Sequence, residues 1–501
     1  MSLLGLDIGI TGCKAVAFGL DGVTLAQAYR EYPLYQPHPG WMELDPAEVW
    51  QAVCEVIGSV TAAAVHDPVT ALSVATHGES VLPVDAAGRP LGRFITALDT
   101  RAEEQARWWG EQVGREHIFQ ITGLPLHPMY TVNKLMWLRQ RQPELFAAAR
   151  RFLCMQDFVF HQLGLPPTMD FSLAARTMAL DIGRLAWSEE IVELARLDVA
   201  QLSRLLPSGS VVGRIPAPAV EMLGLPPGVV AVTGGHDQPA GALGCGAVAA
   251  GIAMDSTGTV ECVGVASPRL VLDDALLRSN LPVSPHTAPG MTIVFGYSTT
   301  GGALLRWYRD TFGGAELAQA RASGRDVYDL LLDEASSGPS PVLILPHFVG
   351  SGTPWMDAAS KGAILGLDLS TTRGQIVKAM LDSVSYEIKL SLDAMEAAGI
   401  AVEELRAFGG GARSPLWLQV KADVYGKPVR AMDVAEAPCL GVAILAGAAT
   451  GAFASVDEGI SRMVRATYTY QPDPAMVERY EERYALFQQV YPTLAPLNRQ
   501  L

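Results

Sequence analysis

The most constraining feature of this chain is a plan that occurs twice, about half a chain apart. Residues 4–16 and residues 251–265 each read as a strand, an aspartate, a glycine-containing turn and a second strand. This repetition predicts two homologous domains that face each other across a cleft. The length of 501 residues agrees, because single hydrophobic cores stop growing beyond about 250–300 residues. We expect the domains to cover residues 1–248 and 249–501.

Strands alternate with amphipathic helices along the chain, a pattern typical of an α/β fold. Asp45 and Pro46 predict a helix start, and apolar residues recur at helical spacing from there through Val60. Residues 71–75 read as a buried strand. Residues 439–456 carry no charge and are rich in alanine and glycine, and we interpret them as a closely packed buried helix, not a membrane span.

The composition argues against two classes of partner. Acidic residues outnumber basic ones by 52 to 37, the net charge is −15, and lysine and arginine form no stripe, so neither nucleic acid nor an anionic membrane is expected. None of the six cysteines forms a Cys-x-x-Cys pair, which favours reduced thiols in a cytoplasmic protein. The first residues read as a strand and not as a signal peptide.

One aspartate stands where open α/β sheets place their chemistry. A valine-rich strand at residues 229–232 stops at the pair Gly234-Gly235, which presents His236 and Asp237. A helix of small residues is predicted to follow, from 239 to 250. We therefore expect a carboxylate held on rigid backbone at the end of a strand, in a binding crevice.

The turns that follow Asp7 and Asp255 are predicted to bind phosphate, because glycine lets backbone N–H groups approach phosphate oxygens. Two ordinary hairpin turns are the alternative. Asp7 would hold Mg²⁺ through water, since a hard cation prefers carboxylate oxygen. The groups expected at the phosphates are Gly9, Thr11, Gly12, Lys14, Thr257, Gly258 and Thr259.

A third glycine-rich turn reads as a surface for a flat base. Residues 408–417 run from a strand into three glycines and then a helix, although a plain strand-to-helix loop has the same pattern. The sequence contains neither the Rossmann glycine pattern nor a Walker P-loop. It also lacks the His-Glu-x-x-His zinc motif and the Gly-x-Ser-x-Gly elbow of serine hydrolases.

Taken in order, these turns resemble those of the FGGY family of carbohydrate kinases. Residues 129–141 are similar to the family's first signature, except that Arg141 stands where an amide, an acid or a histidine is usual. Residues 362–367 and 375–382 resemble the second signature throughout. The resemblance covers residues 4 to about 450. It implies an α/β fold of two actin-like (ribonuclease-H-like) domains that flank a cleft for ATP and sugar.

The resemblance also implies roles for individual residues. Asp237 would be the general base. Asp237 and Asp7 would also bind Mg²⁺, Asp7 through water. The nucleotide would be bound by the two phosphate turns together with Gly301, Gly410, Gly411 and Ala412. The expected substrate contacts are His77, Glu79, Asp99, Arg101, His236 and Asp237. Ile10 departs from the family where threonine or serine is usual, which puts the role of Thr11 and the strength of ATP binding in question.

The expected reaction is ATP-dependent phosphorylation of a small sugar, either a ketose such as xylulose or a polyol. Glu79 and Asp99 suit vicinal hydroxyls, because a carboxylate accepts from two donors. An aldonate would meet these acids at a cost unless Arg101 offsets it, and Glu79 has the alternative of an ion pair with a nearby arginine. Gluconate, glycerol, L-fuculose and L-ribulose stay open as acceptors, and a non-kinase actin-like ATPase is the alternative outside the class. A homodimer is expected from the resemblance alone.

Overall fold

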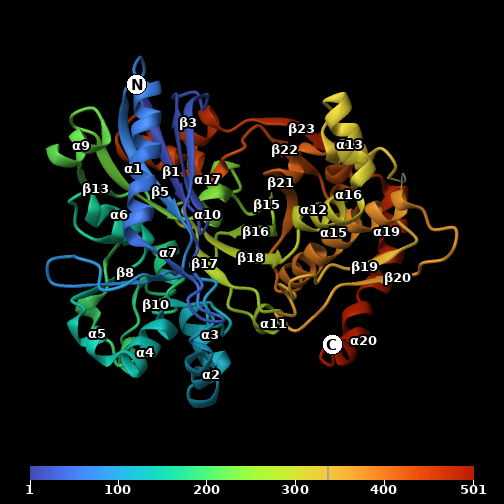
Figure 1. Ribbon diagram of the computed structural model, residues 1–501, viewed down its shortest axis with the longest axis horizontal. Coiled ribbons are helices and arrows are strands. Elements are labelled where there is room, and N and C mark those ends of the chain that lie inside the picture. The colour runs from blue at the N-terminus through green and yellow to red at the C-terminus, as the bar shows by residue number, and fades with distance from the viewer. Residues whose placement is uncertain (336–337) are drawn as a thin grey trace.

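The computed structural model describes residues 1–335 and 338–501 and contains one large sheet in each half of the chain (Figure 1). The first sheet has the strand order β13-β14-β5-β1-β2-β3. Its strands are β1 (Ser2–Ile8), β2 (Gly12–Phe18), β3 (Thr24–Glu31), β5 (Val69–Thr76), β13 (Val211–Arg214) and β14 (Val230–His236). The central strands β1, β5 and β14 are parallel and almost entirely buried, as expected for a sheet covered on both faces.

The second sheet repeats this plan with the order β17-β18-β16-β15-β21-β22-β23. Its strands are β15 (Gly251–Thr257), β16 (Glu261–Ser267), β17 (Val283–Pro285), β18 (Thr292–Ser298), β21 (Val402–Phe408), β22 (Val429–Met432) and β23 (Ala466–Tyr470). In each half an antiparallel hairpin, β1–β2 or β15–β16, is joined on its other side by a parallel strand, β5 or β21. The predicted α/β class and the repeated plan are both confirmed.

Helices cover both sheets (Figure 1). Those that matter for the first sheet are α1 (Pro46–Ala63), α6 (Met155–Gln162), α7 (Phe171–Ala175) and α10 (Asp237–Gly244). Those of the second half are α12 (Gly302–Phe312), α15 (Arg373–Ala397), α16 (Pro415–Tyr425), α17 (Ala437–Ala449) and α19 (Pro474–Phe487). Asp45 caps α1 by accepting a hydrogen bond of 2.9 Å from the Ala47 amide, so the helix start predicted there is confirmed.

The alanine- and glycine-rich helix α17 packs on the first sheet although it belongs to the second half of the chain. Its apolar residues form one buried cluster with β1, β5, β14 and α10. The buried helix predicted within residues 439–456 is confirmed, and no helix among the described residues is long and apolar enough to cross a membrane. Helix α17 belongs to the second half of the sequence but packs on the sheet of the first half, so the domain division at 248/249 stays a prediction.

Contact between α10 and α17 requires glycine on both helices. A Cβ atom on Gly441 would lie 1.9 Å from the backbone oxygen of Ala240, and one on Gly244 would lie 1.9 Å from that of Ala437. A backbone atom cannot move aside as the end of a flexible side chain can. The two helices therefore approach each other as closely as their main chains allow.

We expect Gly441→Ala to destabilise the protein, because the added methyl group would force α10 and α17 apart. Overpacking of this kind costs about 1–3 kcal/mol. Thermal unfolding should show a melting temperature lower by roughly 2–10 °C. Gly314→Ala is the matched control, since a Cβ there meets nothing within 4 Å. Equal melting temperatures for the two variants would contradict the packing account.

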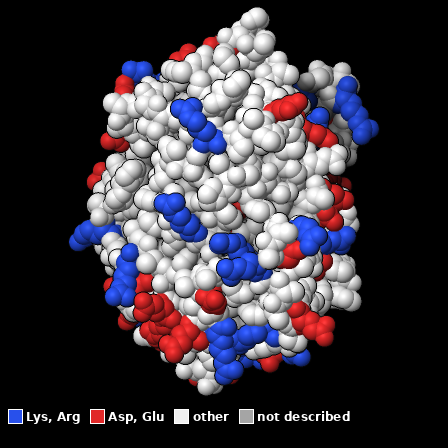
Figure 2. Space-filling model, turned by 90° about the vertical axis from the view of Figure 1, so that its left-hand side faces the viewer, with Lys and Arg blue, Asp and Glu red and all other residues white. Residues whose placement is uncertain are grey.

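Charged side chains are scattered over the face of the molecule drawn in Figure 2. Lysine and arginine occur singly or in small groups, acidic side chains gather toward the lower left of this view, and wide areas between them are uncharged. On this face the basic residues form no continuous stripe of the kind that follows a nucleic-acid backbone.

Candidate active site

The acidic residues singled out from the sequence meet at one edge of the first sheet. Ile8, Thr76 and His236 are register partners at the carboxyl ends of the parallel strands β1, β5 and β14. Asp7 therefore lies one strand away from Asp237, the first residue of α10, because β5, which leads into the segment that carries Glu79, lies between β1 and β14. This is the edge at which open α/β sheets bind their ligands.

The Asp237 side chain is partly exposed, and its Oδ1 atom is buried without a hydrogen-bond partner among the described residues. Burial, followed by the charge of Glu79, raises the pKa of Asp237 to about 7. Its Oδ1 atom lies 3.2 Å from Nε2 of His236, but the two atoms are not aligned for a hydrogen bond, and Oδ1 has no other partner among the described residues. Burial holds the pKa of His236 well below its ordinary value, so the ring is neutral and the contact is no ion pair. Asp237 is thus available to accept a proton.

The backbone before Asp237 is held by α7. The His236 amide donates to Oγ of Ser172 at 2.9 Å, and that hydroxyl donates to Oδ2 of Asp170 at 2.6 Å. Asp170 is the N-cap of α7 and accepts from the Ser172 and Leu173 amides as well. These bonds fix the strand end that presents the carboxyl.

Asp7 is a second carboxyl with an unpartnered buried oxygen. Burial raises the pKa of Asp7 to about 8, and the neighbouring Asp237 and Glu436 contribute to this rise. Oδ1 of Asp7 has no hydrogen-bond partner among the described residues. Two carboxyls with free oxygens suit Mg²⁺, which proteins hold through one or two carboxylates together with substrate phosphates and water. No cluster of three or more side chains suited to metal occurs in the described part of the chain.

The first predicted phosphate turn is a tight hairpin between β1 and β2. The Gly9 amide donates to the Gly12 carbonyl at 2.9 Å, and the Tyr32 hydroxyl donates to the Gly9 carbonyl at 2.5 Å. Thr11 is exposed at the tip. Lys14 forms an ion pair of 2.5 Å with Glu436, which directly precedes α17. The lysine charge therefore already has a partner from the second half.

The second set of predicted nucleotide residues also comes together, at the ends of β15 and β21. The Gly301 amide donates to the Thr259 carbonyl at 2.9 Å, which places the start of α12 against the turn at Gly258. A Cβ on Gly411 would lie 2.2 Å from Cγ2 of Thr257, so the turn that contains Gly410, Gly411 and Ala412 packs directly on β15. Residues far apart in the sequence thus form one surface.

The nucleotide role of Thr257 stays a prediction, and its hydroxyl is buried and bonded within the protein in this structure. Nζ of Lys421 donates to Thr257 Oγ1 at 2.6 Å and to Asp255 Oδ2 at 2.8 Å, and it also contacts Glu261. The Thr257 hydroxyl donates in turn to Glu261 at 3.0 Å. Thr259, in contrast, lies in the exposed turn, where its hydroxyl accepts from Arg306 at 3.0 Å.

Three of the predicted substrate contacts bind other protein groups. Arg101 donates to both oxygens of Asp99, at 2.8 and 2.6 Å, and to Glu43 at 2.8 Å. The two ring nitrogens of His77 lie 2.9 Å from the Ile8 carbonyl and 2.6 Å from the Ser80 hydroxyl. The substrate roles of Asp99, Arg101 and His77 stay predictions, and their polar atoms support the fold in this structure.

Glu79 forms an ion pair with an arginine, which is the alternative to substrate binding that the sequence left open. Nε of Arg176 donates to Oε1 of Glu79 at 2.6 Å, and both side chains are buried. The arginine stem passes directly over Gly78, where a Cβ would lie 2.8 Å from Cβ and Cγ of Arg176. Arg176 follows α7 and was not identified from the sequence.

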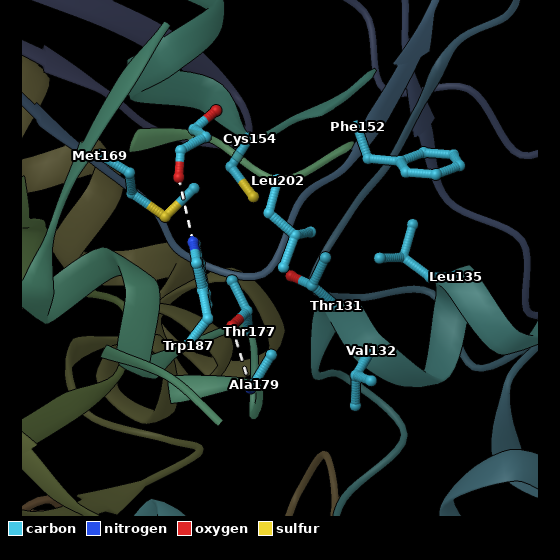
Figure 3. A pocket seen from close by; sticks show the side chains of 11 residues that line it. Thr131, Val132, Leu135, Phe152, Cys154, Met169, Thr177, Ala179, Trp187 and Leu202 are labelled. Carbon is cyan, nitrogen blue, oxygen red and sulfur yellow. Dashed lines mark hydrogen bonds between the residues drawn. The ribbon is translucent and has the colours of Figure 1, made fainter. Parts of the chain in front are cut away.

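Figure 3 shows a small cavity near this segment, to which it is connected through Thr131. Its volume is about 10 Å³, and Leu135, Phe152, Met169 and Trp187 are among the side chains that line it. Such a volume holds one water molecule at most and therefore no sugar. Thr131, which also lines the cavity, donates to the Glu79 carbonyl at 3.0 Å and so connects it to the site.

The second half of the chain covers the Asp237 segment from the opposite side. The rings of His236 and Phe295, a residue of β18, meet edge to face with centroids 6.3 Å apart. A Cβ on Gly235 would lie 2.3 Å from Cγ2 of Thr287. The site therefore lies between the two sheets, with Asp7, Asp237 and the first phosphate turn on the first sheet and the other two glycine-rich turns on the second.

The chain is similar to known proteins over most of its length. Residues 2–244 match the N-terminal domain, and residues 253–450 the C-terminal domain, of the FGGY family of carbohydrate kinases. The chain is 28% identical over 490 residues to a gluconokinase of Bacillus subtilis, with 97% of this chain and 94% of that protein covered. It is 32% identical over 513 residues to a glycerol kinase of Methylibium petroleiphilum, with 99% of each covered. The crystal structure of a xylulose kinase from Rhodospirillum rubrum superposes with a TM-score of 0.88 at 27% identity, over 99% of this chain and 100% of that one.

This chain belongs to the FGGY family of carbohydrate kinases. It has the family's two actin-like (ribonuclease-H-like) domains and is an ATP-dependent carbohydrate kinase. The names of the three relatives point to different acceptors, an acid in one case and neutral molecules in the other two. The acceptor of this chain has to be argued from its own residues.

Proposed function

We propose that this protein transfers the γ-phosphoryl group of ATP to a hydroxyl of a small neutral ketose or polyol, with Asp237 as the general base. The observation that carries the proposal is the free Oδ1 atom of Asp237, at the end of β14 and between the two halves of the chain. A carboxyl with a pKa of about 7 is well matched to proton transfer near neutral pH.

In this reaction Asp237 accepts the proton of the acceptor hydroxyl as that oxygen attacks the γ-phosphorus. The bond between the γ-phosphorus and the bridging oxygen breaks, and ADP leaves. The turns at Gly9–Gly12 and Gly258–Thr259 supply backbone amides to the phosphates, and Gly410 to Ala412 supply a surface for the adenosine. Positioning and electrostatic stabilisation provide most of the acceleration in phosphoryl transfer.

Asp7 and Asp237 would hold Mg²⁺, Asp7 through water. When bound, the ion would neutralise charge on the phosphates. The support for this assignment is the buried oxygen without a hydrogen-bond partner on each of the two carboxyls.

The reaction should depend on pH through Asp237. The carboxyl acts as a base only when it is ionised, and its pKa is raised to about 7. We therefore expect kcat/KM to be constant above about pH 8 and to fall about tenfold per unit well below pH 7. Initial rates from about pH 5 to 9 would show this limb, with thermal unfolding at each pH as the control for stability. A flat profile across this range would contradict the role of Asp237 as base.

The substrate class is tested by ADP release with Mg-ATP against a panel of acceptors. The panel contains D- and L-xylulose, D- and L-ribulose, L-fuculose, glycerol, erythritol, xylitol and gluconate. The proposal expects a strong response from a neutral member and slow ATP hydrolysis without an acceptor. ATP hydrolysis that no acceptor stimulates would contradict it.

A further inference from the structure

A buried ion pair lies beside the proposed base. The Glu79 carboxyl is bound by the guanidinium of Arg176, and its charge contributes to the raised pKa of Asp237. Burial first, and then the charge of Arg176, lowers the pKa of His236 and that of His127, which falls to about 4. A Cβ on Gly78 would lie 2.8 Å from Cγ of Arg176 and 3.4 Å from Cδ2 of His236, so the pair adjoins the strand end that presents Asp237.

The backbone holds this pair rigidly. Glu79 has a φ of 65°, a left-handed conformation that costs free energy for a residue with a Cβ. Its carbonyl accepts from the Thr131 hydroxyl and from Nζ of Lys134, both at 3.0 Å. Gly78 leaves the space through which the Arg176 stem passes. An acceptor molecule therefore meets a preformed pair and does not have to assemble it.

The cations placed around the site already have protein partners. Arg176 binds Glu79, Arg101 binds Asp99 and Glu43, Lys14 binds Glu436, and Lys134 binds the carbonyls of Glu79 and Met129. The carboxyls of Asp7 and Asp237, in contrast, keep oxygens without partners among the described residues. An acceptor with its own carboxylate would meet these acids while the nearby cations are already paired, and an uncompensated buried charge is costly.

We propose that the Glu79–Arg176 pair determines acceptor specificity. Glu79 neutralises the arginine that an acidic sugar would need, and its carboxylate oxygens accept hydrogen bonds from the hydroxyls of a neutral sugar. This inference rests on the proposed function and names the residues that select its neutral acceptor. Gluconate, the acid among the candidate acceptors, is therefore excluded in the natural chain.

Replacement of Glu79 with glutamine tests the proposal, because it keeps the shape of the side chain and releases the charge of Arg176. The quantity to measure is the ratio of kcat/KM for the best neutral acceptor to that for gluconate. We expect Glu79→Gln to lower this ratio at least about tenfold, the change that corresponds to 1.4 kcal/mol. Arg176→Gln should instead raise this ratio. It removes the charge that could bind the gluconate carboxylate there and leaves the Glu79 carboxylate to repel it. The control is Glu404→Gln, which should leave the ratio unchanged. Glu404, like Glu79, forms ion pairs with arginine, in its case Arg406 and Arg430, but it lies in the second sheet.

A second readout separates specificity from a merely structural role. Glu79→Gln should change the KM of gluconate and the KM of the neutral acceptor in opposite directions, which a general loss of structure would not do. An unchanged ratio would overturn the inference, as would a wild-type enzyme that prefers gluconate. If Glu79→Gln does not fold, the wild-type preference and the Arg176→Gln ratio decide the question. A wild-type protein that phosphorylates no panel member would instead count against the proposed function.

Discussion

Replacing Asp237 with asparagine should reduce turnover by about 10²–10⁴-fold, the contribution that a positioned base makes to proton transfer. Asparagine has the shape of aspartate but accepts no proton at neutral pH. The residues assigned to the nucleotide itself lie mainly on the second sheet and its turns, so the affinity for ATP in the absence of Mg²⁺ should be unchanged. Acceptor-dependent ADP release would measure turnover, and calorimetric titration would measure nucleotide binding.

The matched control for this variant is Asp274→Asn, an exposed aspartate in the first turn of α11 (Asp274–Arg278). It makes the same chemical change far from the proposed base and should leave turnover unchanged. If Asp237→Asn kept the turnover of the wild type, Asp237 could not be the general base, whatever its position in the fold.

Replacing Lys421 with methionine should cause the largest loss of stability in the second half of the chain. Lys421 is buried between Asp255, Glu261 and Thr257. Burial lowers the pKa of Lys421, but the two carboxyls outweigh this effect and raise that pKa above its ordinary value. Removing one partner of a buried ion pair costs about 3–5 kcal/mol, because the remaining charge is uncompensated. Thermal unfolding should show a melting temperature lower by roughly 6–20 °C.

Two further variants make the Lys421 prediction specific. Lys427→Met removes an ion pair with Glu396 in which both side chains are partly exposed, and it should cost less than about 1 kcal/mol. Combining Lys421→Met with Asp255→Asn and Glu261→Gln removes the orphaned charges and should restore much of the lost stability. Equal melting temperatures for Lys421→Met and Lys427→Met would show that the buried cluster is not a stabilising element.

The placement of Asp7, Asp237 and the glycine-rich turns could be predicted because it depends on local patterns and on fold class. Each aspartate stands at the end of a strand, and parallel strands bring their carboxyl ends to the same edge of a sheet. The repeated plan at Asp7 and Asp255 extends this reasoning to the second half. Features that depend on backbone position alone were therefore accessible from the sequence.

Side-chain pairing was not accessible, because the partners lie far apart in the sequence. Arg176 and Glu79 are separated by 97 residues, and Lys421 and Glu261 by 160. No periodicity or spacing indicates such pairs, so Arg176 was missed and the bonds of the Thr257 hydroxyl to Lys421 and Glu261 were not anticipated. Helix α10 also ends at Gly244, short of the predicted 250, and Gly246 beyond its end takes a φ of 74°.

The central claim is that the γ-phosphoryl group of ATP passes to a neutral acceptor. Phosphorus NMR of a mixture of enzyme, Mg-ATP and the best neutral acceptor tests it most directly, because the spectrum separates inorganic phosphate from a phosphate ester. The account predicts one molecule of sugar phosphate for each ADP, with little inorganic phosphate and with no ester formed by Asp237→Asn. ADP accompanied only by inorganic phosphate, or an ester formed from gluconate in preference to every neutral acceptor, would contradict it.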